Sequence, residues 1–201
     1  MAHHHSPKIV TDGLVLMLDA ANPKSYPGSG TTWYDLSGNN FDFTLDGSGI
    51  TWNSAGYFSL ADGGATYANN ITDSTTCTFV FWMYTTDLQS LWWKTVGSTV
   101  EYLGAYRSGN KEYYNGFGTG IEFHMDTTQP ANIYDYLPDG NWHMVEFKNV
   151  NMSGIDTNEF NKYGSYTFGN GAVRSIMIYN RNLTSDESLE NYNAYRSRFG
   201  I

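Results

Sequence analysis

Turn-forming residues interrupt this sequence about every ten residues, and the segments between them alternate apolar and polar side chains. Glycine alone supplies 21 of the 201 residues. Alternation with a period of two is typical of β-strands, and short, evenly spaced strands favour a sandwich or barrel of antiparallel sheets. The predicted strands are Leu14–Asp19, Phe41–Leu45, Gly56–Leu60, Thr76–Tyr84, Trp92–Gly97, Val100–Tyr106, Gly120–Met125, Trp142–Lys148, Tyr163–Phe168 and Val173–Tyr179.

Two of these segments differ in the number of faces that they bury. In 76–84 both alternating sets of side chains are apolar, as expected for a strand that is covered on both sides. In 121–126, IEFHMD, one set is apolar and the other is polar. We therefore expect the first segment at the centre of a sheet and the second to turn one face to water.

The segment 184–198 is predicted to be the single helix. Thr184 and Glu187 have the spacing of a capping box, in which each side chain binds the backbone N–H of the other residue. Spacings of three and four place a stripe on one face, made of Leu189, Tyr192 and either Tyr195 or Arg196. We expect this stripe to pack on the sandwich.

The length suits one β-rich domain. We assign residues 13–201 to this domain and residues 1–12 to an N-terminal arm that carries a run of three histidines. A polar terminal segment is ordered when something holds it, so an ordered arm indicates contact with a neighbour. The arm is thus a weak indication of assembly.

The charge excludes two classes of partner. Eleven basic and twenty acidic residues give a formal net charge of -9, so a nucleic-acid backbone or an anionic membrane is repelled. Cys77 is the single cysteine and lies in an apolar run, which predicts a buried thiol and folding in a reducing cytoplasm. The apolar stretches are too short for a membrane helix, and the N-terminus lacks the pattern of a secretory signal.

Three stretches together resemble the laminin-G-like, concanavalin A-like jelly-roll superfamily. They are TFVFWM at 78–83, DGNWHMV at 139–145 and VRSIMIYNRNLTSDE at 173–187, and their order and spacing match the superfamily as well. The resemblance implies an all-β jelly-roll sandwich with one C-terminal helix. A doubly covered strand, a large buried tryptophan and a capped helix after the last strand agree with that fold.

The two ends of the chain narrow the resemblance. Residues 9–26, 33–40 and 191–200 are similar to laminin-G-like proteins encoded by tailed bacteriophages. This similarity implies a structural protein of the virion, attached to capsid, neck, tail or fibre, that folds in the host cytoplasm. Its expected partners are other virion proteins and further copies of itself.

Catalysis is not predicted. Glycan-cleaving members of the superfamily carry carboxylates at alternate positions of one strand, so that an acid and a nucleophile lie about 5 to 5.5 Å apart. The nearest analogue is Glu122-x-His124-x-Asp126, which we interpret as solvated side chains on a wet strand face. We expect no catalytic residues.

Many laminin-G-like domains bind Ca²⁺ at the rim of the sandwich through hard oxygen ligands. The residues that could supply such oxygens are Asp19, Asn22, Asp35 and Asn39. The alternative is that these side chains bind nearby backbone N–H groups in turns. We favour hydrogen bonds within turns, and expect no cofactor unless these residues bind Ca²⁺.

Sugar binding needs aromatic platforms beside hydrogen-bonding groups. The candidate ligand-binding residues are Trp92, Trp93, Tyr113, Tyr114, Tyr134 and Tyr136. Adjacent residues of a strand point to opposite faces, so only one of Trp92 and Trp93 is needed for the core. The other is available for a subunit interface, which we favour, or for a glycan.

Three functions follow from these observations. The favoured one is a non-enzymatic structural protein of a phage particle that acts through protein–protein contacts at its sheet edges, arm or aromatic patch. The second is a carbohydrate-binding adhesin for host-surface glycans. The third, a polysaccharide hydrolase, is disfavoured by the absence of paired carboxylates.

Overall fold

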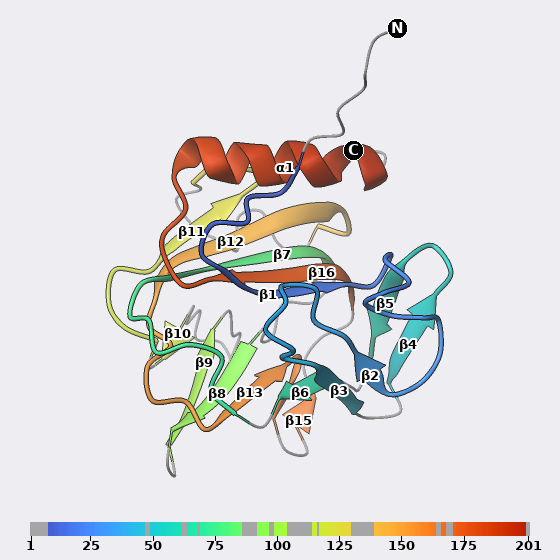
Figure 1. The fold of residues 1–201 in the computed structure, drawn as a ribbon, viewed down its shortest axis with the longest axis horizontal. Helices are drawn as coiled ribbons and strands as arrows, with labels where there is room; N and C mark the ends of the chain where they lie inside the picture. The colour runs from blue at the N-terminus through green and yellow to red at the C-terminus, as the bar shows by residue number, and fades with distance from the viewer. Residues whose placement is uncertain are drawn as a thin grey trace, which may run out of the picture.

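The computed structural model describes residues 8–46, 49–61, 64–67, 69–85, 92–96, 99–103, 114–115, 117–129, 139–163, 166–167 and 171–199. Two seven-stranded antiparallel sheets stack face to face, and helix α1 (Ser185–Phe199) lies along the outer side of one of them (Figure 1). The predicted jelly-roll-like β-sandwich with one C-terminal helix is confirmed. In the described part of the chain, no helix is both long enough and apolar enough to cross a membrane.

We name the sheet beneath the helix sheet A and the opposite one sheet B. Sheet A has the order β11-β12-β7-β16-β5-β4, with β1 also paired to β16, and sheet B has the order β10-β9-β8-β13-β6-β3-β2. The strands of sheet A are β1 (Leu14–Asp19), β4 (Ile50–Asn53), β5 (Tyr57–Leu60), β7 (Cys77–Thr85), β11 (Glu122–Met125), β12 (Trp142–Val150) and β16 (Gly171–Tyr179). Those of sheet B are β2 (Thr32–Trp33), β3 (Phe43–Asp46), β6 (Gly64–Tyr67), β8 (Trp92–Val96), β9 (Thr99–Leu103), β10 (Tyr114–Asn115) and β13 (Thr157–Phe160). A separate pair joins β14 (Lys162–Tyr163) to β15 (Tyr166–Thr167).

Strand β7 is central, as its two apolar faces predicted. It pairs with β12 on one side and with β16 on the other. Phe79 and Phe81 on its inner face are fully buried between the sheets, whereas Val80 and Trp82 on its outer face are buried beneath the helix. Burial on both faces explains why this strand has no polar alternation.

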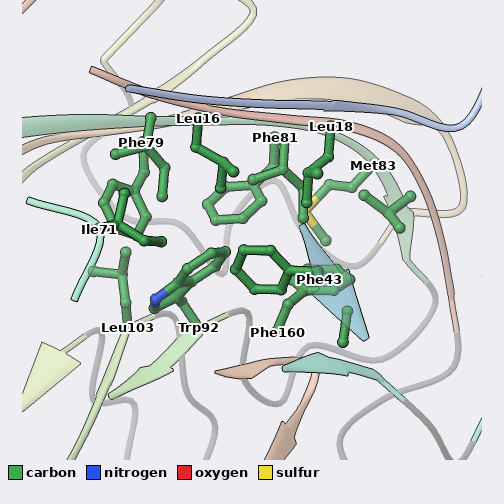
Figure 2. Close-up of a cluster of buried hydrophobic side chains, with 14 of the residues drawn as sticks. Leu16, Leu18, Phe43, Ile71, Phe79, Phe81, Met83, Trp92, Leu103 and Phe160 are labelled. Atoms are coloured by element: carbon green, nitrogen blue, oxygen red, sulfur yellow. The ribbon is translucent and has the colours of Figure 1, made fainter. Parts of the chain in front are cut away.

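The main core fills the space between the two sheets. Aromatic rings from both sheets meet there at inclined angles, as in the contact between Phe79 and Trp92, whose ring centroids are 5.2 Å apart. Figure 2 shows Trp92 and Phe160 of sheet B facing Phe79 and Phe81 of sheet A. Cys77 is buried in the same cluster, and burial raises the pKa of its thiol to about 11.

A second apolar cluster lies between sheet A and helix α1. Trp82 stacks with Tyr192 and Tyr195 of the helix at centroid distances of 5.7 and 6.0 Å. Val10 is buried in this cluster, and its backbone N–H donates to Asn191 Oδ1 at 2.9 Å. Val10 of the predicted arm is therefore packed against the chain's own helix.

The helix begins with the predicted capping box. Thr184 N–H donates to Glu187 Oε2 at 2.8 Å, and Glu187 N–H donates to Thr184 Oγ1 at 3.3 Å. The predicted apolar stripe is wrong at Leu189, which is 46% exposed. The buried face instead includes Ser188 and Asn191, because these polar side chains find hydrogen-bond partners on sheet A and on residue 10.

Several strands were not predicted, among them β4, β6 and β13. Each is four residues long, and β6 and β13 carry Gly, Asn or Glu positions that weaken a strand pattern. The predicted strand 163–168 is divided between β14 and β15.

Candidate functional site: the outer face of sheet B

The two adjacent tryptophans of β8 have separate roles. Trp92 is 0% exposed, and its Nε1–H donates to Asn158 Oδ1 at 3.2 Å. Trp92 therefore belongs to the core and is not a surface platform for a ligand. The position of Trp93 falls on the opposite face of the sheet, because successive residues of a strand alternate.

The other predicted aromatic residues lie beyond what the structure describes. This holds for the side chains of Trp93 and Tyr114, and for Tyr113, Tyr134 and Tyr136 as whole residues. Their assignment to ligand binding stays a prediction.

The strand register places the position of Trp93 in a row that crosses the whole of sheet B. Neighbouring strands pair one residue of this row with the next, and every position in it lies on the outer face. At the usual spacing of strands the row is roughly 28 Å long. In spatial order its residues are Thr32, Thr44, Thr66, Glu159, Trp93, Tyr102 and Asn115.

This row, which we call the outer row of sheet B, combines hydroxyl, carboxylate, aromatic and amide groups. Thr44 is exposed, and Thr32, Thr66 and Glu159 are half-buried. Figure 1 shows helix α1 on the far side of the molecule, over sheet A, so the helix does not cover this face. The register that brings the seven residues together joins segments from residue 32 to residue 159, which periodicity within one segment does not reveal.

The predicted calcium ligands Asp19 and Asp35 use their oxygens within the protein. Asp35 Oδ1 accepts the N–H groups of Met17 and Ser37, both at 2.9 Å, and Oδ2 accepts the Ser37 hydroxyl at 2.6 Å. Asp19 is 1% exposed, and its Oδ2 accepts the guanidinium of Arg198 at 2.9 Å. These contacts fasten turns, as the alternative interpretation expects.

Asn22 and Asn39 have similar contacts. Asn22 Oδ1 accepts Lys24 N–H at 3.0 Å, and the Asn39 amide donates to Val15 O at 2.9 Å. Within the described ranges no three His, Cys, Asp or Glu side chains are grouped so as to hold a metal ion. Calcium binding stays a prediction, and the geometry favours turn chemistry at all four residues.

The Glu122, His124 and Asp126 side chains do not share one face, contrary to the sequence expectation. His124 Nε2 lies 3.4 Å from Glu122 Oε2. Strand β11 ends before Asp126, whose backbone has a φ of 48° and begins a tight turn. The turn directs the Asp126 carboxylate to His143, with 2.6 Å between Oδ2 and Nδ1.

A buried ion pair that the sequence did not reveal lies between sheet A and helix α1. Glu146 is 0% exposed, and its Oε1 accepts the Ser188 hydroxyl at 2.8 Å and lies 3.6 Å from Lys148 Nζ. Lys148 Nζ also donates to Leu183 O at 2.9 Å. Burial raises the pKa of the Glu146 carboxyl above its ordinary value, although the nearby lysine and hydroxyl lower it.

Comparison with known proteins places this geometry in a structural context. No family model and no curated protein sequence matches the chain. The fold is similar to that of Trypanosoma rangeli sialidase, solved in complex with 2,3-difluoro-KDN, with a TM-score of 0.57 and 14% identity over 98% of this chain and 36% of that chain. The chain spans about a third of the length of the sialidase chains.

A second solved structure matches the chain over nearly the whole of both molecules. It is domain 4 of AbnA, an extracellular arabinanase from Geobacillus stearothermophilus, in complex with arabinotriose. The TM-score is 0.58 and the identity 12%, over 89% of this chain and 98% of that domain. At this level of identity the likeness shows the fold alone: a β-sandwich that also occurs in proteins that act on or bind carbohydrates.

Proposed function

We propose that this chain is a non-catalytic carbohydrate-binding domain that holds its ligand on the outer row of sheet B. The observation that carries the proposal is the register, which aligns the positions of Trp93 and Tyr102 with Glu159 and with threonines of two further strands. Ligand sites combine aromatic surface with a few polar groups that fix orientation. A sugar ring offers both kinds of contact, C–H groups on its faces and hydroxyls on its rim.

The negative charge of the chain narrows the class of glycan that it can bind. Glu159 occupies the middle of the row, and Asp46 lies exposed at the end of β3, on a protein of net charge -9. A carboxylate accepts hydrogen bonds from hydroxyl groups and repels other carboxylates. The proposed ligand is therefore a neutral glycan and not a polyanionic one.

Two comparisons support a carbohydrate ligand. The structure of AbnA domain 4 was solved with arabinotriose, and that domain has nearly the same extent as this chain. The sialidase was solved with a sugar analogue, but this chain corresponds to about a third of it. The separation of Glu122 and Asp126 on β11 and its turn gives no support to a hydrolase.

The virion role stays a prediction from the resemblance of the two ends of the chain to phage proteins. It is compatible with the proposed binding, since a domain that recognises glycans on a particle would be both a structural component and an adhesin. The exposed Leu189 on helix α1 offers an apolar contact on the side away from the outer row. Locating the chain in an intact particle would test this role.

Glycan binding is tested with an array of neutral and acidic oligosaccharides that includes arabinotriose, followed by calorimetry on the best ligand. We expect Trp93→Ala to weaken binding at least tenfold, about 1.4 kcal/mol, with an unchanged unfolding midpoint. The control is Leu189→Ala, which removes an exposed apolar side chain from the opposite side of the molecule. Absence of binding to any glycan, or an unaltered profile in Trp93→Ala, would refute the proposal.

A further inference from the structure

His143 lies between two carboxylates at the rim of the sandwich. Its Nδ1 is 2.6 Å from Asp126 Oδ2, and its Nε2 is 3.0 Å from Asp139 Oδ2. The His143 side chain is 13% exposed, whereas the Asp126 and Asp139 side chains are 30% and 35% exposed, so the imidazole is largely covered and the carboxylates reach water. The three residues come from the turn after β11, the turn before β12 and the second residue of β12.

The protonation state of the two imidazole nitrogens follows from this arrangement. A neutral imidazole carries one N–H and one lone pair, whereas the imidazolium carries two N–H groups. Carboxylate oxygens are acceptors, and here one faces each ring nitrogen. Only the protonated ring can donate to both, because a neutral ring would turn a lone pair toward one carboxylate.

The electrostatics agree with this geometry. The hydrogen bond with Asp126 raises the pKa of His143 above its ordinary value, against partial burial, which lowers it. Burial raises the pKa of Asp139, but hydrogen bonds from Asn141 and His143 outweigh it and hold that pKa below its usual range. On the neighbouring strand β7 the residue paired with His143 is the uncharged Met83. The charged groups that act on the pKa of His143 are the two aspartates.

The two aspartates stand at the two ends of one connection. Asp126 directly follows β11, and Asp139 lies three residues before β12. The first end is strained, because Asp126 and Thr127 have left-handed φ angles of 48° and 72°. It is held by Met144, whose N–H donates to Asp126 Oδ1 and whose carbonyl accepts Asp126 N–H, both at 2.9 Å.

We propose that Asp126, His143 and Asp139 form a proton-dependent clasp that ties the turn after β11 to the start of β12 and loosens when the imidazole loses its proton. The clasp is closed below the pH at which His143 titrates and opens as the pH rises through it.

The test follows the imidazole and the turn separately in the full chain. Two-dimensional NMR over a pH series records the Cε1–Hε1 signal of each histidine, and amide hydrogen exchange records the Met144 N–H. We expect His143 to titrate at higher pH in the folded chain than in the chain unfolded by denaturant, because its pKa is raised by the hydrogen bond with Asp126. Exchange of Met144, corrected for its intrinsic pH dependence, should rise severalfold across the His143 transition.

Three variants distinguish the clasp from a merely structural histidine. Asp139→Asn should move the His143 transition, and the onset of Met144 exchange with it, to lower pH. His143→Gln, which offers one donor and one acceptor, should raise the exchange and remove its pH dependence. His124→Gln, on the same rim, should change neither. A His143 transition at or below its value in the unfolded chain, or Met144 exchange that does not follow this transition in both wild type and Asp139→Asn, would overturn the proposal.

Discussion

The outer faces of the two sheets differ in their exposure to solvent. The face of sheet A is covered by helix α1, and Trp82 and Tyr179 are fully buried there. The outer face of sheet B has exposed or half-buried polar residues such as Thr44, Thr66 and Glu159. The sequences of the strands carry this difference, because β7 is apolar on both faces whereas β3 alternates apolar and polar residues. One face is devoted to stability, and we assign ligand binding to the other.

The largest effect on stability is expected at Trp82. Trp82→Ala removes a buried indole and its stacking with Tyr192 and Tyr195. Truncation of a buried aromatic residue costs about 3 to 5 kcal/mol, and the double stacking places this one near 5 kcal/mol. Guanidinium denaturation measures the loss. A loss below about 1 kcal/mol would mean that the helix contributes little to the fold and would remove the contrast between the faces.

The buried ion pair beneath the helix predicts a somewhat smaller effect. Lys148→Met leaves the Glu146 carboxylate buried without its cation, which costs about 3 kcal/mol at pH 7. The pKa of Glu146 is already raised, so its carboxyl binds a proton more readily in the folded state. The stabilisation linked to this proton is present at acid pH and lost as the pH rises through the raised pKa.

Denaturation at two pH values tests this account. The cost of Lys148→Met should be smaller at the lower pH, because a protonated Glu146 no longer needs a cation. The double variant Glu146→Gln, Lys148→Met should regain most of the stability and lose the pH dependence. A cost that is the same at both pH values would show that Lys148 acts through packing and its bond to Leu183 O.

The capping box tests how the helix is held at its first turn. Thr184→Ala should destabilise the chain by about 1 kcal/mol, because Glu187 N–H loses its acceptor. Ser185→Ala, one residue along and exposed, is the matched control. Thermal unfolding compares the two, and equal midpoints would mean that packing alone fixes the start of the helix.

The Glu187 carboxylate of the capping box also predicts how the stability of the fold changes in acid. Hydrogen bonds from the Arg181 guanidinium and the Thr184 N–H lower the pKa of Glu187 to about 2. A lowered pKa stabilises the folded chain above the unfolded value of 4.5, and this stabilisation is lost as the pH falls through about 2. Glu187→Gln should therefore have a smaller free energy of unfolding than wild type at neutral pH, and the two values should converge in strong acid.

Features within one segment could be predicted from the sequence, whereas contacts between distant segments determine which side chains are buried. The cap at Thr184 and the double burial of β7 depend on residues within one segment, so both could be predicted. The outward position of Leu189 could not, because Ser188 finds Glu146 and Asn191 finds Val10, partners 42 and 181 residues away.

The candidate site was predictable to a smaller extent. Strand alternation separates Trp92 from Trp93, and the structure identifies Trp92 as the core residue. The outer row depends on how seven strands pair, and β6 and β13, which supply Thr66 and Glu159, were not predicted as strands. The two aspartates around His143 were equally hidden, since a left-handed turn redirects Asp126 from the face that alternation assigns to it.

The smallest expected effect on stability belongs to the open face and completes the contrast. Thr44 is exposed in the middle of β3 and pairs with Thr32 and Thr66. Thr44→Ala should change the free energy of unfolding by less than about 0.5 kcal/mol, because the side chain is in water. If the outer row binds a glycan along its length, the same change should weaken that binding severalfold, since a hydroxyl partner is lost. Thr44→Ser, which keeps the hydroxyl, should retain the affinity. Calorimetry and denaturation on the two variants separate the roles: a stability loss without a change in affinity would place Thr44 in the scaffold and confine the ligand to the half of the row around Trp93.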